Sequence, residues 1–119
     1  SWLKNVVEHY GFKLKDLNII FCSDAKILSI NKTFLNHNYY TDVITFPYSS
    51  EKYISGDIFI SIDTVLHNSE LFNQSFNREL NRVIVHAVLH LLGFNDKTNE
   101  ETSLMRTTEN YWLDRLNIF

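Results

Sequence analysis

The stretch VIVHAVLHLLGFNDK (residues 83–97) predicts the central helix of the fold. Every residue from Val83 to Leu92 is apolar except His86 and His90. A helix without a broad polar face is normally buried, so we expect this one to run through the interior of the domain. Its two imidazoles then need partners, because leaving a buried polar group unpaired costs about 1–3 kcal/mol.

His86 and His90 are spaced so that they can share one metal ion. Side chains at i and i+4 leave a helix on the same face, one turn apart. Gly93 can adopt a positive φ and end the helix. The chain then turns back, so that Asp96 can provide a third ligand to the same ion. Three protein ligands leave a fourth position open, as in catalytic zinc sites, whereas structural zinc sites have four ligands and usually include cysteine. Zinc in an open site lowers the pKa of its water toward ~7, which favours hydrolysis.

Two alternatives to a catalytic zinc site remain open at this point. In the first, both histidines are core residues that hydrogen-bond to the backbone, and Asp96 is a solvated loop residue or a cap. In the second, the helix belongs to a metallopeptidase. Such enzymes place a glutamate directly after the first histidine as general base, and Ala87 occupies that position here. The spacing favours the metal over core histidines, and Ala87 argues against a peptidase.

The segments around this helix alternate between helical and strand patterns. Helices are predicted at 2–12 with Gly11 as the stop, from a cap at Ser23 or Asp24 to Phe34, at 63–72, at 77–93, and from the capping box of Thr98 and Glu101 to Leu116. Strands are predicted at 17–23, 41–48 and 53–62. This order implies an α/β (α+β) sandwich: one domain, residues 1–119, with a small mixed sheet flanked by about five helices. The metal site would lie on the C-terminal part of a buried helix.

The composition fits one soluble domain, since 119 residues suffice for one hydrophobic core and are too few for two. No apolar run reaches the ~20 residues of a membrane helix, and SWLKNVVEHY lacks the order of a secretory signal, so we expect a cytoplasmic protein without a membrane partner. Cys22, the one cysteine, stands in an apolar run and is expected to be a core residue. The net charge of −3 is unusual for a nucleic-acid binder, unless a local basic groove or a ribosomal partner compensates.

Three segments of the chain resemble the YbeY family of bacterial endoribonucleases, which mature ribosomal RNA and act in ribosome quality control. INKTFLNHNYYTDVITFPY (30–48) is similar to the family's LN…TDVLSFP segment without a gap. SGDIFIS (55–61) is similar to its LGDI(x)IS strand, and HAVLHLLGFND (86–96) to its HGxLHLxGxDH signature. The three motifs occur in the family's order and with its spacing, so the resemblance is specific and covers most of the chain.

The resemblance implies an α/β sandwich with a small mixed sheet and one zinc ion held by three histidines beside a cleft. His86 and His90 match the first two ligands, and Asp96 falls where the signature has the third histidine. A carboxylate oxygen is a competent zinc ligand, so the site can survive the exchange. The carboxylate lowers the net charge of the site by one, which makes the bound water less acidic than three imidazoles would.

A second departure from the family falls at Leu35, where relatives usually carry an arginine thought important for activity. An arginine beside a metal can hold a phosphate or offset charge that builds up in the transition state. Lys97, next to the proposed ligand Asp96, is one candidate replacement, and His37 and Lys32 are two others.

The sequence assigns no catalytic residue beyond the metal ligands: the candidates are Asp57, Lys97 and Arg82, and no residue is assigned as the general acid. Asp57 could orient a metal-bound imidazole from behind, or simply form a turn or cap at the edge of a strand. Arg82 stands one turn before His86 on nearly the same face. It could therefore point into the cleft, or form a salt bridge with Glu79 or another acid.

Two aromatic residues and one acid in the first family segment have two interpretations each. Tyr39 and Tyr40 could stack on unpaired bases, or could pack inside the protein. Asp42 could brace the entry to the following strand as a cap, or belong to the functional site.

These observations lead to the hypothesis of a zinc-dependent, single-strand-specific endoribonuclease. The resemblance implies 3′ end processing of 16S rRNA and ribosome quality control, with precursor rRNA and the small ribosomal subunit as partners. One alternative is a ribosome assembly factor in which the metal is mainly structural, favoured by Leu35, Ala87 and the acidic net charge. A metal-dependent hydrolase of another class is a further alternative, because three-ligand zinc sites serve several chemistries.

Overall fold

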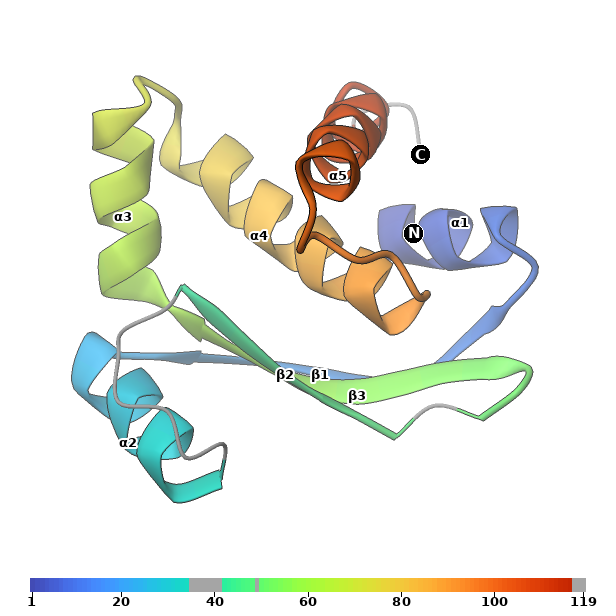
Figure 1. The fold of residues 1–119 in the computed structure, drawn as a ribbon, viewed down its shortest axis with the longest axis horizontal. Coiled ribbons are helices and arrows are strands. Elements are labelled where there is room, and N and C mark those ends of the chain that lie inside the picture. Colours follow the sequence, from blue (N-terminus) through green and yellow to red (C-terminus); the bar gives the residue numbers. More distant parts are fainter. Residues whose placement is uncertain (35–41, 49, 117–119) are drawn as a thin grey trace.

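Three strands form a mixed sheet between helices in the computed structural model, which describes residues 1–34, 42–48 and 50–116. Helices α1, α3, α4 and α5 lie on one side of this sheet and α2 lies on the other (Figure 1). Along the chain the elements are α1 Trp2–His9, β1 Lys13–Cys22, α2 Asp24–Phe34, β2 Val43–Pro47, β3 Tyr53–Ser61, α3 Ile62–Leu71, α4 Phe76–Leu91 and α5 Asn99–Leu113. The predicted α+β fold, with a small mixed sheet and five helices in the described ranges, is confirmed.

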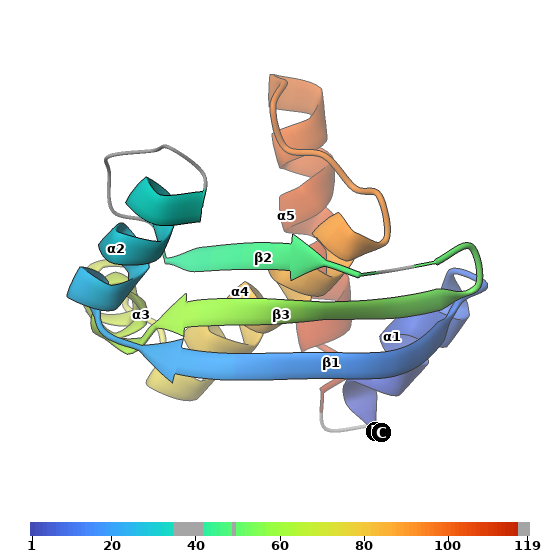
Figure 2. The same cartoon turned by 90° about the horizontal axis from the view of Figure 1, so that it is seen from below.

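The sheet has the strand order β1-β3-β2, with β3 in the centre (Figure 2). β1 runs parallel to β3, and β2 runs antiparallel to it. The first strand is longer than the predicted 17–23, because its pairing with β3 reaches back to Lys13 across an irregularity between Leu14 and Leu17. Residues 13–16 carry two lysines and an aspartate, so pairing with a neighbouring strand, and not apolar content, forms this part of the strand.

Side chains along β3 alternate between two hydrophobic clusters, one on each face of the sheet. Ile58 and Ile60 are buried in the main core together with residues of α1, α4 and α5. Phe59, between them, packs on the other face against a smaller cluster that contains Ile27 and Ile30 of α2. The alternation therefore assigns each residue of β3 either to the α4 side or to the α2 side.

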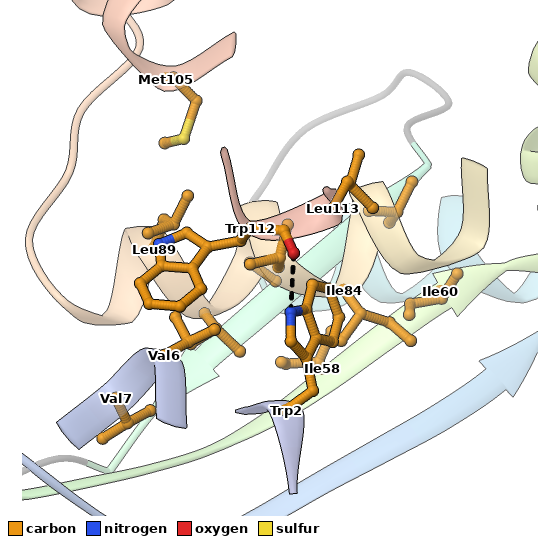
Figure 3. Close-up of a cluster of buried hydrophobic side chains, with 14 of the residues drawn as sticks. Trp2, Val6, Val7, Ile58, Ile60, Ile84, Leu89, Met105, Trp112 and Leu113 are labelled. Carbon is orange, nitrogen blue, oxygen red and sulfur yellow. Dashed lines mark hydrogen bonds between the residues drawn. The ribbon is translucent and has the colours of Figure 1, made fainter. Parts of the chain in front are cut away.

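α1 and α5 close the main core over α4. Trp2 and Trp112 are both buried, and Nε1 of Trp2 donates a hydrogen bond of 2.9 Å to the carbonyl oxygen of Trp112 (Figure 3). The buried helix predicted at 77–93 corresponds to α4, which Ser75 caps at its start and which Gly93, with φ of +104°, follows at its end. Among the described residues, no helix combines the length and the apolar character needed to cross a membrane.

Gly56 allows α4 and β2 to approach β3 closely. A Cβ atom at this position would stand 2.8 Å from the carbonyl oxygen of Phe46 and 3.4 Å from the side chain of Leu91. The first contact is with backbone, which cannot rotate away. We expect Gly56→Ala to lower the free energy of unfolding by about 1–3 kcal/mol, the usual cost of overpacking. Urea denaturation followed by circular dichroism measures this change, and an unaltered midpoint would show that the sheet adjusts without cost.

Candidate metal centre

Three potential metal ligands converge at the end of α4. Nε2 of His86 lies 3.0 Å from Nε2 of His90, and the carboxylate oxygen Oδ2 of Asp96 lies 3.4 Å from the first and 3.2 Å from the second. The helical spacing brings the two imidazoles together, and the turn after Gly93 returns Asp96 to them. The three residues that the sequence analysis selected as ligands are therefore grouped in the structure, in an arrangement that could hold a metal ion.

The backbone fixes the orientation of the His90 ring. Nδ1 of His90 lies 2.9 Å from the carbonyl oxygen of Phe94. A carbonyl oxygen can only accept a hydrogen bond, so Nδ1 carries the proton and donates it. In the neutral ring, Nε2 is then left with a lone pair, and this lone pair is directed toward His86 and Asp96.

A buried carboxylate fixes the orientation of the His86 ring in the same way. Nδ1 of His86 lies 2.6 Å from Oε2 of Glu109, whose side chain is only 5% exposed. Burial raises the pKa of Glu109, but its hydrogen bond to His86 and the nearby cations outweigh burial and leave the pKa below its ordinary value. Glu109 is therefore ionised and accepts the Nδ1 proton, so Nε2 of His86 also keeps its lone pair when the ring is neutral.

The pKa of His86 reflects the same contact. Burial lowers it, but the hydrogen bond and the negative charge of Glu109, together with the charges of Asp96 and Asp42, raise it by more. The net shift is upward. The surrounding carboxylates thus stabilise a positive charge on the ring, and a proton and a metal ion would compete for Nε2, since only the neutral ring can bind a metal.

The donor set fits zinc. With metal–ligand bonds of about 2.0–2.1 Å, ligand atoms around a tetrahedral zinc ion stand roughly 3.3–3.4 Å from one another. The three separations here, 3.0, 3.2 and 3.4 Å, are close to this value. Three lone pairs that face one another repel, and a cation between them would remove the repulsion. Zinc-binding histidines generally donate their second ring N–H to a carbonyl or a carboxylate. The Nδ1 atoms of His90 and His86 make these contacts with Phe94 and Glu109.

The two imidazoles are less buried than the sequence predicted. Their side chains are 27% and 33% exposed, for His86 and His90 respectively, while the apolar residues of α4 around them are buried. His86 and Asp96 line a cleft of about 260 Å³ between α4 and α5 that also reaches the end of α3. The metal centre therefore opens to a cleft and is not enclosed in the core.

Asp57 does not orient an imidazole, which is one of the two roles that the sequence left open for it. Asp57 and Phe59 are two residues apart on β3, so their side chains lie on the same face of the sheet, the α2 face, opposite α4. Its carboxylate accepts hydrogen bonds from Asn18 at 3.0 Å and from the hydroxyl of Tyr48 at 2.9 Å. Since Glu109 and Phe94 hold the Nδ1 atoms of the two rings, the expectation that Asp57 orients an imidazole is corrected: Glu109 makes this contact.

Arg82 lines the cleft, but its guanidinium is bound to two residues of α5. Its guanidinium donates to Glu109 at 3.0 Å and to the side-chain oxygen of Asn110 at 2.8 Å, and its side chain is 12% exposed. The predicted salt bridge thus forms with Glu109 and not with Glu79. For Lys97, the described contact is a backbone one, from its N–H to Glu101.

Four residues with a predicted role lie outside the described residues. They are Leu35, at the position of the missing arginine, His37, a candidate replacement for it, and the candidate base-stacking residues Tyr39 and Tyr40. Lys32 lies in the last turn of α2. Helix α2 lies on the far side of the sheet from α4 (Figure 1).

Glu109 was not among the residues predicted from the sequence, although its position carries a recognisable pattern. Met105, Glu109 and Trp112 follow one another at helical spacing on α5, and all three are buried. An acid on the apolar side of a helix needs a partner, since a buried charge is costly without one. That pattern could have identified Glu109 as a member of a buried polar network.

Comparisons with known proteins agree with this geometry. Residues 1–117 match the family model described as Endoribonuclease YbeY. Proteins named Endoribonuclease YbeY from Parabacteroides distasonis and Phocaeicola vulgatus are 52% and 51% identical to the chain over 110 residues, which is 92% of this chain and 78% and 80% of theirs. The solution structure of TM1509 from Thermotoga maritima is similar with a TM-score of 0.68 and 30% identity, over 95% of this chain and 75% of that one.

Proposed function

Because the chain belongs to the Endoribonuclease YbeY family, we propose that it is a zinc-dependent endoribonuclease that cleaves single-stranded RNA in the cytoplasm. The observation that carries the zinc dependence is the convergence of His86, His90 and Asp96, whose ligand atoms lie 3.0–3.4 Å apart beside a cleft. The proposed catalytic unit is a single domain, residues 1–119, that holds one zinc ion.

The residues around the three ligands have distinct tasks in this proposal. Zinc in an open three-ligand site activates water as a nucleophile at neutral pH and polarises a phosphoryl oxygen. Glu109 and the carbonyl of Phe94 keep the Nδ1 protons in place, so that both Nε2 atoms face the ion. Arg82 balances the charge of Glu109 and holds it in position through a 3.0 Å contact. The cleft admits the RNA strand to the ligands from the side of α3 and α5.

The proposed substrate is precursor rRNA on the small ribosomal subunit, where the enzyme matures the 3′ end of 16S rRNA and takes part in ribosome quality control. Membership in a family named for endoribonuclease activity supports an RNA substrate. With a net charge of −3 the chain has no overall excess of cations to hold RNA, which favours a substrate presented by a ribosomal partner. Co-sedimentation with purified subunits tests this part: we expect the protein in the small-subunit fraction.

The zinc dependence is tested on the purified protein with a fluorescently labelled single-stranded RNA. We expect a chelator to abolish cleavage and added zinc to restore it, while a duplex of the same sequence stays intact. His90→Ala is the matched control, and it should remain inactive with zinc because one ligand is missing. Cleavage that persists in chelator and in His90→Ala would mean that the metal centre is not the nuclease site.

The alternative, an assembly factor with a mainly structural metal, is less consistent with this site. Both imidazoles are partly exposed, His86 and Asp96 line a cleft, and Cys22, the one cysteine, packs on the α2 face of the sheet. The same His90→Ala variant separates the two functions. Retained ribosome binding and a native circular dichroism spectrum with lost cleavage support the enzyme, whereas unfolding of the variant supports a structural ion.

A further inference from the structure

The cleft beside the metal centre extends beyond the three proposed ligands, toward the end of α3 and the middle of α5. We propose that this part of the cleft binds one unpaired nucleotide next to the cleavage site, with its base against Phe72 and Glu79 and a phosphate on Arg106. The inference rests on the proposed ribonuclease function and adds to it the residues that select the RNA. α3 and α5 lie on either side of the first half of α4, where the cleft is formed (Figure 1).

Glu79 is the observation that points to a ligand. It lies in the first turn of α4, lines the cleft and is only 5% exposed. Within the described parts of the chain, its carboxylate has no hydrogen-bond or ion-pair partner, because the nearest arginine on the helix, Arg82, is bound to Glu109 and Asn110. Burial raises the pKa of Glu79, and the negative charges of Asp42 and Glu109 raise it further. The positive charges of Arg82 and Arg106 lower it, but by less.

A buried carboxylate that faces a cleft accepts N–H groups from whatever enters it. The Watson–Crick edges of unpaired bases supply such groups. Guanine offers two adjacent donors, N1–H and the N2 amino group, which the two oxygens of a carboxylate can accept together. Uracil has one N–H on this edge, between two carbonyl oxygens that repel a carboxylate. Glu79 should therefore favour guanine over uracil.

Phe72 provides the surface on which a base would stack. It follows α3 directly, lines the cleft and is 55% exposed, although it is a large apolar side chain. Exposed aromatic rings beside a cleft are typical of proteins that bind single strands, because every base has a π face that can stack. The position of Phe72 in the same cleft as Glu79 lets one base contact both.

Arg106 provides the phosphate contact. Its side chain is 58% exposed and lines the cleft from α5. Its described ion pair, to Glu109, is 3.7 Å long, and Glu109 is already bound more closely by Arg82 at 3.0 Å and by His86 at 2.6 Å. The guanidinium thus keeps N–H donors for a phosphate, for which its planar fork is well suited.

The test compares zinc-loaded wild-type protein and variants on ten-nucleotide oligouridine RNAs in which one central position is uridine, guanosine or inosine. Cleavage gives kcat/KM, and fluorescence anisotropy with phosphorothioate RNA, which resists hydrolysis, gives the dissociation constant. We expect guanosine to be favoured about tenfold over uridine, and inosine, which lacks the N2 amino group, to lose most of this preference. Glu79→Gln should remove the preference by lowering kcat/KM for the guanosine RNA and raising it for the all-uridine RNA, because an amide does not repel the carbonyl oxygens of uracil as a carboxylate does.

Two further variants test the stacking and phosphate contacts. Phe72→Ala should weaken binding of all three RNAs about tenfold, and Phe72→Trp should restore it. Arg106→Gln should weaken binding of all three and reduce the slope of log affinity against log salt by about one. Matched controls are Phe21→Ala, which removes an equally exposed ring outside the cleft, and Arg78→Gln, whose cation pairs with Asp114. Zinc content and thermal stability should be unchanged throughout.

Equal affinity for guanosine and uridine in the wild-type protein, or a guanosine preference that survives in Glu79→Gln, would overturn the nucleotide subsite. If the wild-type protein still cleaves these RNAs, the proposed ribonuclease function stands in either case. Wild-type protein that neither binds nor cleaves any of the RNAs would overturn the proposed function, and the subsite with it.

Discussion

Asp96→Ala is expected to leave the purified protein without zinc and without nuclease activity. The carboxylate of Asp96 is one of the three proposed ligands, and its Oδ2 lies 3.2 and 3.4 Å from the two imidazole nitrogens. Two imidazoles alone hold zinc weakly, because catalytic sites generally use three protein ligands. Metal analysis by mass spectrometry should give one zinc per chain for the wild type and close to none for the variant. Asp114→Ala, which removes an exposed aspartate at the end of α5, is the control and should retain its zinc.

The reverse test is Asp96→His, which places the family's third histidine in the same position. We expect this variant to retain zinc and activity, because imidazole nitrogen is also a zinc ligand. The exchange raises the net charge of the site by one, so the bound water should lose its proton more readily and the pH–rate profile should move to lower pH. Full zinc content in Asp96→Ala would exclude Asp96 as a ligand, and an inactive Asp96→His would show that the backbone around residue 96 admits only the shorter side chain.

Glu109→Ala is expected to weaken both the fold and the metal centre. The carboxylate of Glu109 joins His86 at 2.6 Å to Arg82 at 3.0 Å, and the side chain of Arg82 is only 12% exposed. Removing one partner of a buried ion pair leaves the other charge without compensation, which costs about 3–5 kcal/mol. Loss of an acceptor behind a metal-binding histidine typically weakens metal affinity about 10–100-fold. Urea denaturation and zinc titration against a competing chelator measure the two effects separately.

The isosteric change Glu109→Gln distinguishes the two tasks of this residue. Its amide oxygen can still accept the Nδ1 proton of His86, while its amide nitrogen, a donor, faces the guanidinium of Arg82. We therefore expect zinc affinity close to that of the wild type but a clear loss of stability. Glu100→Ala, at an exposed position in the first turn of α5, is the control and should change neither quantity. A stable Glu109→Ala protein with unaltered zinc affinity would contradict the proposed role of Glu109.

The sequence predicts most of the fold, because hydrophobic spacing and caps are local properties. The capping box of Thr98 and Glu101 starts α5 as predicted, and the apolar run of residues 83–92 marks the buried helix. The beginning of β1 could not be predicted in the same way. Its residues 13–16 are mostly polar, and they become a strand only because β3 lies alongside them. Strand pairing between distant segments leaves little trace in local composition.

The metal centre is predicted in part, for a related reason. His86 and His90 lie on one helix, so their separation follows from helical geometry alone. Asp96 needs only one turn of the backbone in addition, which Gly93 supplies. The acceptor behind His86, however, comes from a residue 23 positions later on another helix, and no local pattern can align Glu109 with His86. For Asp57 the sequence left two roles open, and the structure decides between them because the side chain of Asp57 lies on the same face of β3 as that of Phe59, away from α4.

The position of α5 has a consequence for the order of events during synthesis. Trp112 covers Trp2 in the core, and Glu109 holds the ring of His86. α5 leaves the ribosome after every other described element of the chain. A nascent polypeptide that is halted before residue 99 already contains both histidines and Asp96, yet it lacks the helix that seals the core and turns the first imidazole. Formation of the proposed metal centre is thus coupled to completion of α5, and the site takes its final geometry only when this last described helix has been made.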